Sequence, residues 1–226
     1  MSRLWAGALV LLLATATGCS AEERSSTPAG ALVEAAGRGD EEVVRDLIER
    51  GADPNEADGT GRTAVTAAVY AGSAVVVRLL VDAGADVDRQ DETRANAFLA
   101  LGETGDVDVL DEVLRADPDV RRTNRFGGTA LIPAADRGHV EMVRALLERT
   151  KVDVDHVNDL GWTALLEAVI LGDGGSAHQQ IVEMLLEAGA DASIVDNDGV
   201  SALEHARRLG YTELERTLQT RDRRGG

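Results

Sequence analysis

The histidines of this chain do not have the spacing of a metal site. The four histidines are His139, His156, His178 and His205. No cysteine, histidine or glutamate stands near them at the intervals that zinc sites use. We therefore expect no bound metal.

Nucleophile and phosphate-loop motifs are also missing. Residues 102–105 and 172–175 are rich in glycine, but neither segment follows a predicted strand or ends in Gly-Lys-Ser/Thr. Carboxylates are so abundant that some pairs will lie close by chance, and proximity alone does not support acid–base catalysis. We expect a protein that is not an enzyme and has no cofactor.

The sequence consists of repeats of nearly constant length. Gly-Ala-Asp stands at residues 51–53, 84–86 and 189–191. Two tracks share successive offsets of 33, 33, 34 and 38 residues: Thr63, Asn96, Thr129, Thr163 and Ser201, and Asp53, Asp86, Asp119, Asp153 and Asp191. Such a period is typical of stacked repeats. The longer offsets indicate one extra residue near Lys151 and five in Gly172–Ser176.

Each repeat has the same internal pattern. Thr63–Ala71 predicts a short helix with a threonine N-cap, and Gly72 and Ser73 break it. Ala74–Ala83 has apolar residues at helical spacing on one face, and Gly84 stands where a left-handed C-cap is wanted. A polar, glycine-rich turn follows. One repeat is therefore helix, turn, helix and hairpin.

These residues resemble the ankyrin repeat. The matching segments of one repeat are 58–65, 68–69, 72, 76–77, 80–81 and 84–88. Alanine stands at 64, 97, 130, 164 and 202, where the family usually has proline. The resemblance implies an all-α ankyrin-repeat solenoid of about six repeats over residues 30–218, with the outer two as caps. It also implies that His139 and His178 stabilise turns.

Two turns depart from the pattern. Asp117 replaces the capping glycine and precedes Pro118, which disfavours a left-handed conformation before it. Thr150 stands at the equivalent place in the next repeat, followed by the inserted Lys151. We expect both turns to differ from the others and to be the weakest seams of the stack.

The resemblance implies a binding groove lined by hairpin tips and inner helices. Carried onto this chain, with the insertion added, the candidate partner-binding residues are Thr60, Arg62, Tyr70, Thr93, Glu103, Phe126, Asp136, Arg137, Leu160, Trp162, Ile170, Leu171 and Asp173. Phe126, Leu160 and Trp162 would form an apolar cluster, although one of them could instead pack on its neighbouring finger. The insertion with Asp173 would project beside the groove, or it is a tolerated surface loop.

The N-terminus predicts export. Residues 1–18 have a positive start and an apolar run too short to span a membrane, as in secretory signals. Residues 16–19 resemble a lipoprotein lipobox, with Ala16 where leucine is usual, so that Cys19 would be lipidated. The alternative is a plain signal peptide with an incidental cysteine. Residues 19–29 would form a flexible tether, and residues 219–226 a disordered basic tail.

A net charge of −17 argues against nucleic acid as a partner. We expect a monomer that is held at the membrane or the periplasmic face of the bacterial envelope by its lipid alone. Three functions stay open. The first is an envelope-anchored protein-interaction scaffold. The second is an accessory or regulator of another exported protein, for example catalase support or toxin inhibition. The third is a receptor for a small ligand or cation.

Overall fold

The computed structural model describes residues 30–225, with side chains described up to residue 220. Within this range twelve helices form six pairs. The first helices of the pairs are α1 (Ala31–Gly37), α3 (Ala64–Tyr70), α5 (Ala97–Thr104), α7 (Leu131–Asp136), α9 (Ala164–Ile170) and α11 (Ala202–Leu209). The second helices are α2 (Glu41–Glu49), α4 (Ala74–Asp82), α6 (Val107–Leu114), α8 (Val140–Arg149), α10 (Ser176–Glu187) and α12 (Thr212–Gly225).

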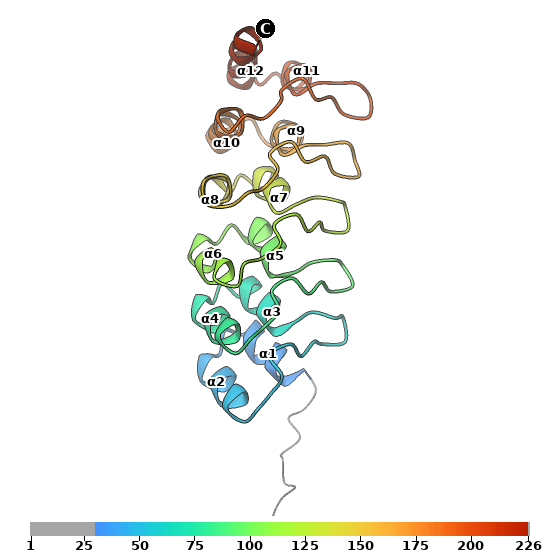
Figure 1. The fold of residues 1–226 in the computed structure, drawn as a ribbon. Coiled ribbons are helices and arrows are strands. Elements are labelled where there is room, and N and C mark those ends of the chain that lie inside the picture. Colours follow the sequence, from blue (N-terminus) through green and yellow to red (C-terminus); the bar gives the residue numbers. More distant parts are fainter. Residues whose placement is uncertain (1–29, 226) are drawn as a thin grey trace, which may run out of the picture.

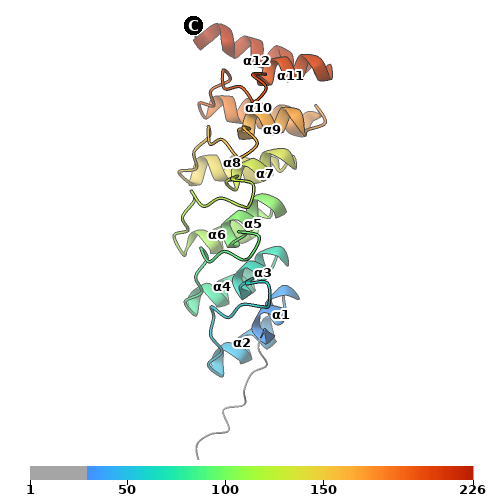
Figure 2. The same ribbon diagram turned by 90° about the vertical axis from the view of Figure 1, so that its right-hand side faces the viewer.

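The pairs stack into an elongated solenoid with two layers of helices (Figures 1 and 2). The first helices form the inner layer beside the hairpins, and the second helices form the outer layer. Phe98 is the largest fully buried side chain, and aliphatic residues fill most of the remaining core. The predicted six-repeat all-α solenoid is confirmed.

The helices begin and end largely as the sequence predicts. The Thr63 hydroxyl accepts the N–H of Thr66, and Thr163 caps α9 in the same way. Gly84 follows α4 with φ of 91°, the left-handed conformation expected of a capping glycine. The threonine track therefore positions the inner helices.

Repeat four departs from this pattern at its start. α7 begins at Leu131, one residue later than in the equivalent repeats, and its N-cap Ala130 has helical angles. The Thr129 hydroxyl is buried without a hydrogen-bond partner. Ala130 packs so closely on α5 that a Cβ on Gly102 would lie 2.1 Å from the Ala130 carbonyl oxygen. The irregular start of α7 thus depends on glycine at residue 102.

The expected conformation at Asp117 is wrong. Asp117 has φ of 51°, so it takes the left-handed conformation despite the following proline. Aspartate tolerates this region better than most residues, and the Asp117 N–H still bonds the Leu114 carbonyl at 3.1 Å. At the regular turns the residue after the left-handed one donates a second backbone hydrogen bond. The Ala85 N–H, for example, bonds the Leu80 carbonyl at 2.9 Å. Pro118 has no N–H and cannot make that bond.

The turn at Thr150 differs from the others, as predicted. Thr150 is extended, with φ of −129° and ψ of 176°. Its hydroxyl donates to the Leu146 carbonyl at 2.6 Å and accepts the Val152 N–H at 3.3 Å. Side-chain bonds therefore replace the left-handed cap at this seam.

We expect Asp117→Gly to stabilise the protein by about 1 kcal/mol, because glycine removes the strain of a left-handed β-carbon. Urea unfolding followed by circular dichroism measures the change. Asp53→Gly, at an exposed turn residue that the regular repeats retain, is the matched control, with no expected gain. A loss of stability in Asp117→Gly would show that the aspartate itself holds this turn.

Three of the four histidines, His139, His156 and His178, join neighbouring repeats, whereas His205 bonds within its own repeat. His139 Nε2 donates to the Glu103 carbonyl at 3.1 Å, and His178 Nε2 donates to the Asp136 carbonyl at 3.0 Å. Both rings therefore bond the carboxyl end of the preceding inner helix, which agrees with the predicted turn role. His156 bonds the Gly127 carbonyl at 2.6 Å, and His205 bonds Asp196 at 2.7 Å.

The prediction of a disordered tail from residue 219 is wrong for residues 219–225, because α12 continues to Gly225. Gln219 bonds Glu215 at 2.7 Å, and the Thr220 hydroxyl bonds the Arg216 carbonyl at 2.8 Å. No proline or glycine interrupts the segment before Gly225, so the helix has no reason to stop earlier. The predicted signal, lipidation site and tether at residues 1–29 lie outside the described residues.

Candidate functional site

A repeated Asp or Asn side chain shapes each hairpin finger. These residues are Asp58, Asp91, Asn124, Asn158 and Asp196. In the fourth finger Asn158 Oδ1 accepts the N–H groups of Leu160 and Trp162, each at 3.0 Å. In the third finger Asn124 holds Phe126 and Gly128 similarly, at 2.9 and 3.0 Å. The finger Asp or Asn therefore fixes the predicted tip positions. The sequence alone did not indicate this role.

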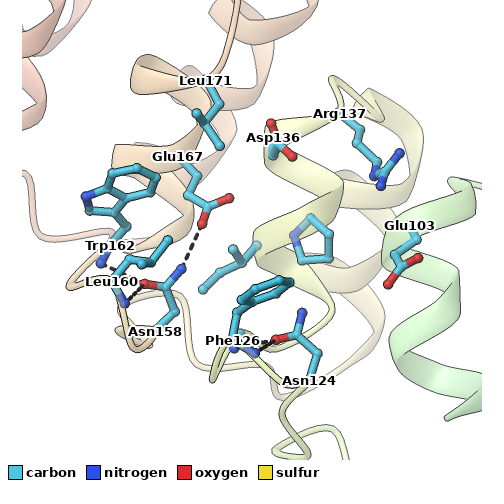
Figure 3. A pocket seen from close by; sticks show the side chains of 13 residues that line it. Glu103, Asn124, Phe126, Asp136, Arg137, Asn158, Leu160, Trp162, Glu167 and Leu171 are labelled. Atoms are coloured by element: carbon cyan, nitrogen blue, oxygen red, sulfur yellow. Dashed lines mark hydrogen bonds between the residues drawn. The ribbon is translucent and has the colours of Figure 1, made fainter. Parts of the chain in front are cut away.

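Two adjacent fingers and the inner helices below them enclose a pocket of about 250 Å³ (Figure 3). Seven of its thirteen lining residues were predicted as partner-binding: Glu103, Phe126, Asp136, Arg137, Leu160, Trp162 and Leu171. The other six are Asn124, Gly128, Ile132, Pro133, Asn158 and Glu167. We call this cavity the finger pocket.

One side of the finger pocket is apolar and open to solvent. Phe126 is 51% exposed, Leu160 48% and Leu171 51%, so all three present large apolar surfaces. The predicted cluster of Phe126, Leu160 and Trp162 does line one cavity. Arg125 stacks on the Phe126 ring at 4.7 Å, so one face of that ring is already covered.

The other side of the finger pocket is acidic. Glu167 on α9 is only 7% exposed, and its Oε1 accepts the side-chain amide of Asn158 at 2.7 Å. Burial and the nearby Asp136 carboxylate raise the pKa of Glu167 to about 7. In Figure 3 the Glu167 carboxylate lies between Trp162 and Asp136. A buried carboxyl group therefore titrates near neutral pH beside the exposed aromatic surface.

Two further predicted residues, Arg62 and Tyr70, form a polar cluster with Glu103 next to the finger pocket. Arg62 lies over the Tyr70 ring at 5.1 Å, and the Tyr70 hydroxyl donates to Glu103 at 3.1 Å. Burial, with the charge of Glu103, raises the pKa of Tyr70 to about 12. Because Glu103 also lines the pocket, it links Arg62 and Tyr70 of repeat two to the finger pocket.

The remaining predicted residues have mainly local contacts. The Thr60 hydroxyl bonds Asp58 and the Thr93 hydroxyl bonds Asp91, each at 2.6 Å, so both are engaged within their own fingers. Ile170 is partly buried against the core. Asp173 accepts the Gly175 N–H at 2.8 Å and bonds His178 at 2.9 Å.

The insertion is packed rather than freely projecting. Its last residue, Ser176, begins α10, so part of the inserted length extends that helix. The Tyr211 hydroxyl of the next repeat donates to the Gly172 carbonyl at 3.0 Å, and the Tyr211 ring lies against Gly174. These contacts favour a structural role for the insertion between repeats five and six.

Sequence reasoning missed Asn158 and Glu167. The residue nine positions after each finger Asp or Asn is Ala67, Ala100 or Pro133 in repeats two to four, but Glu167 in repeat five and His205 in repeat six. The substitution at Glu167 could be seen when the repeats are aligned. Its hydrogen bond to Asn158 could not be inferred from the sequence, because the two side chains meet only when the finger lies on its own inner helix.

Comparison with known sequences decides the family. The sequence model described as "Ankyrin repeats (3 copies)" matches residues 6–93 and 97–196. The chain belongs to the ankyrin repeat family. YahD of Escherichia coli (strain K12), whose name describes an ankyrin repeat protein, is 44% identical over 77 residues. That match spans 34% of this chain and 38% of YahD.

Solved ankyrin repeat structures agree along most of the chain. An ankyrin repeat domain from Acinetobacter baumannii AYE is 44% identical with a TM-score of 0.80, covering 85% of this chain and 98% of that domain. The ankyrin repeat protein EF0377 is 39% identical with a TM-score of 0.81, covering 86% and 98%. Ankyrin repeat proteins are generally non-enzymatic scaffolds for protein–protein interaction, and this chain has that architecture.

A more distant likeness shows the fold alone. One chain of the complex between the predatory endopeptidase Bd0816 of Bdellovibrio bacteriovorus and the immunity protein Bd3460 is 24% identical, with a TM-score of 0.67.

Among residues 30–225 no helix is long and apolar enough to cross a membrane.

Proposed function

We propose that this ankyrin repeat protein is a scaffold that is anchored to the bacterial envelope and binds a protein partner through its finger pocket. The observation that carries the proposal is the meeting of Phe126, Leu160 and Trp162 beside the buried Glu167 in one open cavity. Exposed aromatic and apolar side chains that line a concavity are typical of interface hot spots. We propose that the protein acts as a monomer.

The anchor is the second part of the proposal and depends on the N-terminal sequence. Residues 16–19 resemble a lipobox, and lipidation of Cys19 with two or more acyl chains would hold the protein stably at a membrane. Residues 20–29 would then separate the folded repeats from the lipid.

We expect Cys19→Ser to move the protein from the membrane fraction to the soluble fraction of cells that express it. Loss of the lipid removes the apolar chains that partition into the bilayer. Fractionation with palmitate labelling measures both location and modification. A Cys19→Ser variant that stays in the membrane fraction would contradict the lipid anchor.

A role as an accessory or regulator of another exported protein is a special case of the same scaffold, with the partner named. Catalase support would require that deletion of the coding region sensitise the cell to peroxide. Inhibition of a toxin would require that the deletion strain be killed by its own effector. No side chain in the described residues favours either role over the other.

We expect Phe126→Ala with Trp162→Ala to weaken partner capture at least tenfold, because truncation of a single hot-spot residue costs about 2 kcal/mol or more. Pull-down from envelope extracts with quantitative mass spectrometry measures it. Val43→Ala with Val75→Ala is the matched control, since both valines are exposed on the outer helices α2 and α4. Equal capture by the two double variants would refute the groove as the binding surface.

A further inference from the structure

Three carboxylates border the finger pocket, and one of them is deeply buried. Glu103, Asp136 and Glu167 all line the cavity. Glu167 receives one hydrogen bond, from Asn158, and no other described residue bonds its second carboxylate oxygen. A largely buried carboxylate that lines a pocket attracts a hydrogen-bond donor or a positive charge that enters the pocket.

Among the described residues, no cation pairs with the carboxylates of the finger pocket. Arg137 lines the pocket, but among the described residues it forms no ion pair with any of the three carboxylates. Arg125 is stacked on Phe126. The neighbouring histidines are also engaged. His178 bonds the Asp136 carbonyl and the Asp173 carboxylate, and His205 bonds the Asp196 carboxylate. The acidic side of the pocket therefore stays uncompensated.

The rest of the lining selects the type of cation. No group of three or more described His, Cys, Asp or Glu side chains is placed to hold a metal ion. Trp162, Leu160 and Leu171 instead offer apolar surface above the carboxylates, and no cation of the described residues is stacked on the Trp162 ring. A basic side chain combines an apolar stem with a charged end that carboxylates and an indole ring both attract.

We propose that the finger pocket binds one basic side chain, lysine or arginine, from the protein partner, with its charged end beside Glu167 and its stem against Trp162. This inference rests on the proposed function and adds the chemistry of the partner. It fits the acidic character of the whole chain, whose net charge of −17 would attract a basic segment.

Two small probes that differ by the terminal ammonium group test this pocket on the full-length chain. Nα-acetyl-lysine methylamide carries the ammonium, and Nα-acetyl-norleucine methylamide is its neutral counterpart. Binding is followed at pH 8, where Glu167 is mainly ionised, through the indole N–H signal of Trp162 in nuclear magnetic resonance spectra. The chain has two tryptophans, so Trp162→Phe assigns the signal. We expect millimolar affinity for the lysine probe and at least fivefold weaker binding of norleucine.

Glu167→Gln separates charge from shape, because glutamine keeps the acceptor for Asn158 and removes the negative charge. We expect this variant to lose at least fivefold in affinity for the lysine probe while its affinity for norleucine stays unchanged. Glu183→Gln, at an exposed residue of α10, is the control and should bind as the parent does.

Equal binding of both probes, or undiminished lysine binding by Glu167→Gln, would contradict the binding of a basic side chain in this pocket. The proposed scaffold function would be unaffected. Absence of any Trp162 shift at 50 mM of either probe would contradict the binding of a basic side chain as well. Whether the groove binds a partner is decided separately by the pull-down with Phe126→Ala and Trp162→Ala.

Discussion

Glu167→Gln is expected to stabilise the folded protein by about 2–3 kcal/mol at pH 8, although it replaces a residue of the finger pocket. Burial and Asp136 raise the pKa of Glu167 from the ordinary 4.5 to about 7. The ionised form is therefore less favourable in the folded state than in the unfolded chain. Glutamine keeps the bond from Asn158 and avoids this penalty.

The pH dependence gives this expectation its sign. Between pH 4.5 and 7 the folded chain holds a proton on Glu167 that the unfolded chain has released, so the stability of the parent falls as pH rises. Above pH 7 both states are ionised and the penalty is full. The stabilisation by Glu167→Gln should therefore shrink to about 1 kcal/mol or less at pH 5. Urea unfolding at both pH values measures it.

Glu183→Gln serves as the control and should change stability by less than about 0.5 kcal/mol at either pH, because Glu183 is exposed. A gain from Glu167→Gln that is the same at pH 5 and pH 8 would contradict the raised pKa. A clear loss at pH 8 would show that the ionised carboxylate is compensated in the folded protein.

Gly102→Ala is expected to destabilise the protein by about 2–3 kcal/mol and to lower its melting temperature by about 4–10 °C. The added Cβ would lie 2.1 Å from the carbonyl oxygen of Ala130 and 2.9 Å from its carbonyl carbon. Both are backbone atoms, so relief requires α5 and the start of α7 to separate. The helix propensity of alanine offsets only about 1 kcal/mol of this.

Gly37→Ala is the matched control, because Gly37 is also an inner-helix glycine but its Cβ would meet only the Ala67 side chain at 3.7 Å. This variant should be neutral or gain up to about 1 kcal/mol. Thermal unfolding followed by circular dichroism compares the two. A Gly102→Ala variant as stable as Gly37→Ala would contradict the close approach of Ala130.

The repeat register could be read from the sequence, because every repeat must place the same residue types at the same turns. Thr63, Thr163 and Gly84 act as the sequence predicts. Asp117 does not take the extended conformation that the following proline predicts. Packing between repeats requires a left-handed turn there, and this outweighs the conformational preference that Pro118 imposes on the residue before it. The helix through residues 219–225 was missed because polar composition alone does not distinguish a tail from a surface helix.

The candidate site could be predicted in part. The resemblance placed Phe126, Leu160 and Trp162 on adjacent fingers, and the structure brings them to one cavity. The acidic side was missed, since the burial of Glu167 arises only when the finger lies on α9 and Asn158 reaches the carboxylate. Asp173 was assigned to the groove by its position in the chain, whereas its bonds to His178 and Gly175 hold the insertion together.

Site-specific photocrosslinking in living cells tests whether the finger pocket faces a protein partner. Benzoylphenylalanine is placed at Leu160, in the pocket, or at Val75, on the outer face of α4; both parent residues are exposed. We expect a discrete adduct from Leu160, none from Val75, and loss of the adduct when Trp162→Ala is added. Adducts from Val75 alone, or a Leu160 adduct that survives Trp162→Ala, would contradict partner binding through this pocket.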